Sequence, residues 1–358
     1  MKRLPALDAL RGIAILIVLV HHYVPEQFKP PLFWSGVDLF FVLSGFLITD
    51  ILLKNRDASN YYQTFYLRRG ARILPLYWLL LLAFFLVMRL EPEILGSSFS
   101  KHLPFWSYAT FTQNFLYSIR NFWRDPWLDV TWSLALEEQF YVFLSLSVRN
   151  LNKKYLAGVS IFLILLAPVL RFFTDAPLVS YQLPLHRADS LMLGVLIAIL
   201  WQSQTAQDFI HAKKKYFLWA LPVFFIGIAY LFKTEAGIGL PIPHFFLAFF
   251  YADLLILGLV SSADKPGIFF GNKVLGWLGL RSYGIYLLHK PIRLVFATLL
   301  AGASITLDPV VAMLLVCVLL CVVAELSYRL IEKPIMNWGH QFKYRLSLSP
   351  VPALDGRA

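Results

Sequence analysis

One stretch of the sequence, WSLALEEQFYVFLSLSV at residues 132–148, has the composition of a membrane helix but holds two adjacent carboxylates, Glu137 and Glu138. A helix that crosses a bilayer needs about 20 mostly apolar residues. A carboxylate inside the bilayer costs about 2.5–3.5 kcal/mol on insertion scales. The stretch therefore predicts a membrane helix whose acids have a functional or structural role that offsets this cost.

Composition extends this interpretation to the whole chain. Of its 358 residues, 58% are hydrophobic and 16% are aromatic, which is above the usual range of soluble globular proteins. We therefore expect an all-α, polytopic membrane helical bundle of about ten transmembrane helices. The predicted spans are approximately 7–24, 36–53, 73–90, 132–148, 155–173, 189–203, 216–232, 243–261, 283–302 and 309–331.

The formal net charge of +11 does not point to nucleic acid. Most Lys and Arg residues fall in short connections between apolar runs, where they set the orientation of the helices in the membrane. With ten spans, the basic clusters all lie on the cytoplasmic side. We expect an inner (plasma) membrane protein with both termini in the cytoplasm and with the lipid bilayer as a partner.

One aromatic segment, LPFWSYATFTQNFLYS at 103–118, does not fit this count, because a full crossing there would place the later basic loops outside. We interpret it as a re-entrant or interfacial segment, which is tolerated where protein or water shelters the backbone. The domain prediction is a membrane domain at 1–337 and a short cytoplasmic tail at 338–358. Cys317 and Cys321 have no metal-ligand spacing, and no metal is expected.

Polar residues of the first span share one helix face. At 100° per residue, Arg11 and His22 differ by about 20°, and Asp8 lies within about 40° of His22. His22 is about 16 Å farther along the helix than Arg11. The face could line an internal polar pathway, or the histidine could lie at the interface. On this geometry alone His21 is an equally good candidate.

Asp38 opens the second span, on the same face as Gly45 and Thr49. It could partner His22, since the hairpin between the two spans is short. Alternatively, it caps the helix and faces water at the headgroups. Gly45 permits the close approach of another helix.

In the stretch 132–148, a polar stripe follows four-residue steps through Ser133, Glu137, Tyr141 and Ser145. Glu138 is rotated by about 100° and is expected near the headgroups or in an ion pair. A carboxylate that faces the bundle interior is a candidate functional group. The alternative is a structural, hydrogen-bonded acid that fixes the register of the helix.

Arginines cluster in FYLRRGARILPLYW, where Arg68, Arg69 and Arg72 lie one helical turn apart. Guanidinium groups match phosphate oxygens, so the cluster suits a phosphorylated ligand. The alternative is orientation of the protein and contact with lipid headgroups.

Two other stretches carry titratable groups at the edge of a span. HRADSLMLG pairs Arg187 with Asp189, and SYGIYLLHKP contains His289. We take these three residues as candidate substrate-binding groups.

Together these stretches resemble acyltransferase family 3, whose membrane proteins acylate sugars and cell-surface glycans. LDALRGIAILIVLVHH is similar to the first helix of the family, in which a histidine follows an Arg-Gly start by eleven residues, and this selects His22 over His21. GVDLFFVLSGFLI, FYLRRGARILPLYW and WSLALEEQFY resemble later blocks, with Glu137 at the acid of the family. HRADSLMLG, SYGIYLLHKP and ELSYRLIEKP continue the resemblance in order over nearly the whole chain.

The resemblance implies transfer of an acyl group, expected to be acetyl, from acyl-CoA to a hydroxyl of a carbohydrate or glycolipid acceptor. Acetyl-CoA would be a co-substrate and not a bound cofactor. Its phosphates would contact the three clustered arginines and Arg11. His22 would be the general base, oriented by Glu137 or Asp38, with direct transfer preferred and an acyl-histidine intermediate left open.

Two rival functions remain at this stage. A transporter or flippase of a lipid-linked sugar would also have polar faces inside a ten-span bundle, but would not need arginines that recognise CoA. A structural or regulatory membrane protein would tolerate the loss of His22 and Glu137. The acceptor and the oligomeric state are not predicted.

Overall fold

The computed structural model of the chain describes residues 4–25, 28, 32–90, 102–120, 127–234, 241–263 and 269–346. Within these ranges the structure is helical, and its one β contact is an isolated bridge between Ala58 and Leu346. The α-helices are α1 Pro5–Tyr23, α2 Gly36–Lys54, α3 Tyr61–Leu90, α4 Phe105–Ala109, α5 Gln113–Ile119, α6 Thr131–Asn150, α7 Lys153–Phe172, α8 Pro177–Gln182, α9 Ala188–Trp201, α10 Gln204–Ala212, α11 Lys214–Thr234, α12 Pro241–Ala263, α13 Lys273–Gly302, α14 Pro309–Ser327 and α15 Lys333–Gly339.

Eight segments of the described chain are helical, long and apolar enough to cross a membrane, which confirms an all-α polytopic membrane bundle. Each of the ten predicted spans falls on a helix, but α6 and α9 do not meet the same criterion. Helix α9 has 14 residues, and all of them from Ala188 to Val195 are buried. Helix α6 carries two carboxylates and a basic last turn. Protein surrounds much of both helices, so neither depends on contact with lipid alone.

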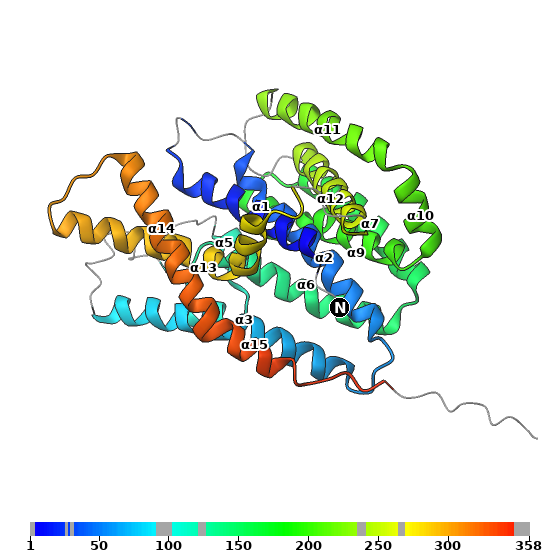
Figure 1. The fold of residues 1–358 in the computed structure, drawn as a ribbon, viewed down its shortest axis with the longest axis horizontal. Helices are drawn as coiled ribbons and strands as arrows, with labels where there is room; N and C mark the ends of the chain where they lie inside the picture. The colour runs from blue at the N-terminus through cyan, green and yellow to red at the C-terminus, as the bar shows by residue number, and fades with distance from the viewer. Residues whose placement is uncertain are drawn as a thin grey trace, which may run out of the picture.

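Helices α1 and α2 lie at the centre of the bundle, α11 lies at one edge, and α3 with α15 lies at the opposite edge (Figure 1). Helix α1 packs along α13, and α2 packs along α9. We call the end of the bundle where α2 ends and α3 begins the basic end, since Lys54, Arg56, Arg68 and Arg149 lie there. The far end is where α1 ends at His22 and Tyr23.

Glycine allows α2 and α9 to pack with their backbones in contact. A Cβ atom on Gly45 would lie 2.0 Å from the carbonyl oxygen of Leu191, and one on Gly194 would lie 2.2 Å from that of Val42. These distances are well inside van der Waals contact, so no larger residue fits without moving a helix. Small residues have this role in membrane bundles, where backbones must approach closely.

Replacing Gly45 with alanine is expected to lower the free energy of unfolding by about 1–3 kcal/mol, the usual cost of overpacking a core. The measurement is chemical denaturation of the purified protein in detergent. The matched control is Gly158→Ala on α7, because a Cβ atom there meets nothing within 4 Å. Equal stability of the two variants would contradict the close packing of α2 on α9.

The segment 103–118 does not cross the bundle. It forms the short helices α4 and α5, of 5 and 7 residues, which are far below the length of a spanning helix. Buried amides hold it in place: Gln113 donates to the carbonyl oxygen of Thr131 at 3.0 Å, and Asn114 exchanges hydrogen bonds with Gln139 at 2.8 and 3.2 Å. A sheltered, non-crossing segment is therefore confirmed.

Helix α3 begins at Tyr61, twelve residues before the predicted span, so the arginine cluster lies on the same helix as the apolar run that follows. The first part of the predicted tail packs against the start of α3. Arg68 Nε donates to the carbonyl oxygen of Phe342 at 2.7 Å, and Asn60 Nδ2 donates to that of Lys343 at 2.9 Å. Residues 347–358 of the predicted tail lie outside the described residues.

Candidate functional site

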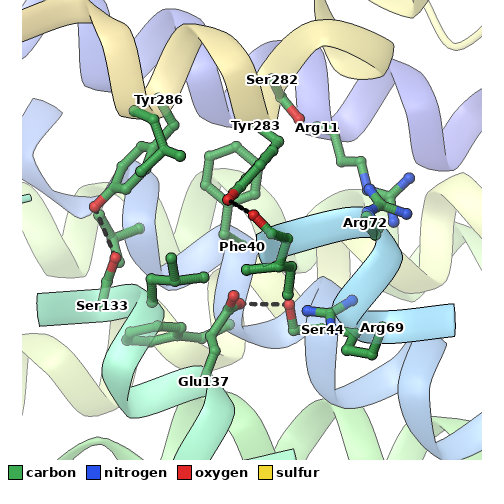
Figure 2. Close-up of a pocket in the computed structure, with 15 residues that line it drawn as sticks. Arg11, Phe40, Ser44, Arg69, Arg72, Ser133, Glu137, Ser282, Tyr283 and Tyr286 are labelled. Atoms are coloured by element: carbon green, nitrogen blue, oxygen red, sulfur yellow. Dashed lines mark hydrogen bonds between the residues drawn. The ribbon is translucent and has the colours of Figure 1, made fainter. Parts of the chain in front are cut away.

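Three neighbouring pockets follow one another through the bundle, as their shared lining residues show, and we call this row of pockets the route. The central pocket is lined by side chains of α1, α2, α3, α6 and α13 (Figure 2). It shares Arg69 and Arg72 with a pocket at the basic end. It shares Val37 and Tyr286 with a pocket at the far end, which His22 also lines. The route therefore runs from the arginine cluster to the histidine.

Three guanidinium groups meet at one side of the central pocket, from Arg11, Arg69 and Arg72 (Figure 2). Arg69 donates to the hydroxyl of Tyr141, and its Nε lies 3.7 Å from Oε1 of Glu138. Arg11 Nη1 lies 3.6 Å from an Asp8 carboxylate oxygen. Arg72 makes no hydrogen bond or ion pair with any residue that the structure describes, although it lines two pockets. The group is thus available to an anionic ligand.

The polar stripe of α6 faces the bundle interior as predicted. Ser44 Oγ donates to Oε1 of Glu137 at 2.5 Å (Figure 2). Ser133 Oγ lies 2.7 Å from the hydroxyl of Tyr286, and Ser145 Oγ lies 2.8 Å from that of Tyr66. Glu138 is rotated out of the stripe and is paired, as the sequence indicated. Glu137 lines the central pocket together with the arginines.

His22 lies at the far end of the route. Its Nδ1 is 3.0 Å from the carbonyl oxygen of Val18, so Nδ1 carries the proton and donates, and Nε2 keeps its lone pair. This is the tautomer that a general base requires. The ring packs against that of His289, with ring centroids 4.8 Å apart and ring planes at 87°. Besides the histidines, five aromatic side chains line the same pocket, namely Phe33, Trp34, Trp132, Tyr181 and Tyr286.

The basic-end pocket combines cations with residues near the C-terminus. Lys54, Arg68, His340 and Tyr344 line it together with the two shared arginines. Desolvation and the nearby guanidinium groups of Arg68 and Arg72 lower the pKa of His340, so this imidazole is neutral at physiological pH. Arg68 is also a structural residue, because its guanidinium lies 5.2 Å from the ring centre of Tyr344 and binds the chain at Phe342.

The expected contact between Asp38 and His22 is wrong. Oδ1 of Asp38 accepts hydrogen bonds from Arg187 and, at 2.9 Å, from Ser190 Oγ. The reason is the direction of its helix face: Asp38 shares that face with Gly45, which contacts α9 and not α1. Asp38 is 1% exposed and lines none of the three pockets.

The predicted pair of Arg187 with Asp189 is also wrong. Asp189 is bound by Arg171 at 2.6 Å, whereas Arg187 binds Asp38 and contacts His244 at 2.6 Å. Both members of the predicted pair are at most 1% exposed and lie outside the three pockets. The two ion pairs instead link α2, α7 and α9 in the protein interior.

Among the polar residues of the route that the sequence interpretation missed are Ser44 and Tyr286. Ser44 precedes Gly45 directly, and Tyr286 precedes His289 by three residues, which places both on the same face of α13. That spacing was the available signal for Tyr286. For Ser44 the sequence holds no clear signal, because a serine in an apolar helix usually bonds to its own backbone.

Comparisons with known proteins identify a family for the chain. The sequence profile of an acyltransferase domain family matches residues 4–328. The peptidoglycan O-acetyltransferase OatA of Listeria monocytogenes is 30% identical over 361 residues, which is 94% of this chain and 56% of OatA. YrhL of Bacillus subtilis, provisionally named a peptidoglycan O-acetyltransferase, is 31% identical over 374 residues, with coverage of 94% and 56%. The chain thus spans about half the length of these relatives. No solved structure matches.

Proposed function

The chain belongs to this acyltransferase family, and on that premise we propose that it is a membrane O-acetyltransferase that moves an acetyl group from acetyl-CoA to a hydroxyl of a cell-wall glycan. The relatives are named for peptidoglycan, which makes it the first acceptor to test. The observation that carries the proposal is the route of three pockets with arginines at one end and His22 at the other.

The basic end suits the donor. Acetyl-CoA carries several phosphate groups, and guanidinium forks bind phosphate oxygens with charge-assisted hydrogen bonds. Arg69 and Arg72 line both the basic-end and the central pocket, so they can hold the phosphates where the pantetheine arm enters the bundle. The arm is about as long as the separation of Arg11 from His22, about 16 Å along α1. We place this end in the cytoplasm, where acetyl-CoA is made.

The far end suits the acceptor. Aromatic rings of Trp34, Trp132 and Tyr181 offer flat apolar faces with polar edges, which fit a sugar ring. Nε2 of His22 takes the proton of the acceptor hydroxyl while its oxygen attacks the acetyl carbonyl carbon. The carbon–sulfur bond breaks, and the thiolate of CoA leaves and takes up that proton. We take the transfer as direct, because Ser44 and Ser133 of the central pocket bond to Glu137 and Tyr286 and not to His22. Glu137 orients the substrates in the central pocket.

The test of the donor is acetyl-CoA binding to the purified full chain in detergent, measured by titration calorimetry. Replacing Arg72 with alanine is expected to weaken binding by about 10–100-fold, since hydrogen bonds to charged groups contribute about 1.5–3 kcal/mol. Arg329→Ala is the control, because Arg329 is 70% exposed and lies outside the pockets. Absence of binding to folded wild-type protein would contradict the proposal and favour a transporter of lipid-linked sugar.

A further inference from the structure

The side chain of His289 on α13 packs against that of His22 and has no exposed surface. Its Nδ1 is 2.7 Å from the carbonyl oxygen of Tyr286 and donates to it. Its own carbonyl oxygen accepts a hydrogen bond of 2.7 Å from the hydroxyl of Tyr23. Its Nε2 is buried and has no hydrogen-bond partner among the described residues. A buried polar atom without a partner costs about 1–3 kcal/mol, so this nitrogen is retained against a penalty.

The two histidine rings are held in a fixed relation. Their centroids are 4.8 Å apart and their planes stand at 87°, so one ring presents its edge to the face of the other. The backbone on both sides is braced, because Arg293 donates to the carbonyl oxygen of His22 and Tyr23 donates to that of His289. These bonds fix the backbones of α1 and α13 relative to each other next to the two rings.

No carboxylate that the structure describes contacts the ring of His22. Asp38 is bound by Arg187, and Asp129 is paired with Lys290 at 2.5 Å. The glutamate of the central pocket accepts from Ser44. A catalytic histidine usually has an acid as its orienting group, whereas Nδ1 of His22 is bound to the carbonyl oxygen of Val18 and its ring packs against a second imidazole.

The charged side chains that line the pocket with His22 are cationic, although one of them, Lys290, is paired with Asp129. Lys290 and Arg293 of α13 line the same pocket, and the ring of His21 on α1 lies 4.8 Å from that of His22. Positive neighbours favour the neutral form of an imidazole. This keeps His22 ready to accept a proton, but it also opposes the imidazolium that forms when it does. A neutral hydrogen-bond acceptor next to the ring would stabilise this imidazolium.

We propose that His289 is the positioning residue of His22, and that its unpartnered Nε2 lone pair and its ring stabilise the imidazolium that His22 becomes. The inference rests on the proposed function, since it requires His22 to act as the base. His22 takes one proton from the acceptor hydroxyl as the new ester bond forms, and returns it to the departing thiolate. His289 itself neither gains nor loses a proton in this step.

The test compares His289→Phe with His289→Gln in the purified full chain, with acetyl-CoA as donor and muramyl disaccharide as acceptor. His289→Phe keeps a ring and removes the acceptor nitrogen, and its kcat is expected to fall about tenfold with KM changed by no more than about twofold. The acid limb of its pH–rate profile is expected at lower pH, because an imidazolium without stabilisation loses its proton more readily. His289→Gln restores an acceptor and is expected to recover part of the rate.

A reduced rate with an unchanged pH profile in both variants would overturn the inference, because it would make His289 a packing residue only. The control is His211→Phe, the same change on α10 and outside the three pockets, with wild-type behaviour expected. His22→Ala separates the two proposals. If it retains full activity, His22 is not the base and the role of His289 fails with it, whereas an inactive His22→Ala with a wild-type rate in His289→Phe overturns only the role of His289. The absence of acetyl transfer by the folded wild-type protein would overturn the proposed function itself.

Discussion

Replacing His22 with alanine is expected to lower the rate of acetyl transfer by about 100–10,000-fold, the usual contribution of a general base. Binding of acetyl-CoA is expected to stay within about twofold, because Arg11, which lines the central pocket with the arginines that would hold the phosphates, is about 16 Å away along α1. The two measurements are initial rates of transfer and a calorimetric titration on the same preparation. A loss of rate with intact binding assigns His22 to the chemical step.

His21 provides the sharpest comparison, since it lies next to His22 and lines the same pocket. His22 has the geometry of a base in the structure, with Nδ1 bound to Val18 and Nε2 available. The loss caused by His21→Ala is therefore expected to be much smaller. Full activity in His22→Ala, or a loss that follows His21→Ala instead, would contradict the assignment of the base.

Features that depend on one helix could be predicted from the sequence. The stripe through Ser133, Glu137 and Tyr141 needed only the periodicity of a helix and the rule that polar groups in a membrane face inward. The same holds for Arg11 and His22, which line successive pockets of one route. Periodicity fixes which side chains share a face, and this was enough to find the two ends of the site.

Contacts between helices could not be predicted in the same way, because periodicity does not say which helix a face meets. Asp38 was placed on the correct face, but its partner is Arg187 on the segment that leads into α9. Gly45 lies on that face and was the available clue, since its close contact identifies the neighbour of α2. His289 is 267 residues from His22, and only the packing of α1 on α13 brings the rings together.

The lengths of the helices show a second limit. Hydropathy marks where a helix leaves the lipid, whereas backbone hydrogen bonds continue into the polar region beyond. Helix α3 therefore starts at Tyr61, ahead of the arginines that precede its apolar run. Helix α9 is instead shorter than a spanning helix. Its 14 residues are shielded by protein and need not match the thickness of the bilayer.

Replacing Arg187 with alanine is expected to lower the free energy of unfolding by about 3–5 kcal/mol, the cost of leaving one charge of a buried pair alone. Asp38 would lose the guanidinium that binds Oδ1, and its other oxygen already has no hydrogen-bond partner among the described residues. Both side chains of the pair are 1% exposed, so water cannot replace the lost partner. The measurement is chemical denaturation in detergent.

The double variant Arg187→Ala/Asp38→Ala is expected to be more stable than Arg187→Ala alone, because it leaves no unpaired charge in the core. Arg329→Ala is the control for the loss of an exposed ion pair, where a change of no more than about 1 kcal/mol is expected. If Arg187→Ala were as stable as this control but no longer bound the glycan acceptor, Arg187 would be a substrate-binding residue, as we expected from the sequence. A large loss of stability that the second substitution relieves would assign the buried pair to the architecture that holds α2 against α9, and thereby to the support of the pocket wall.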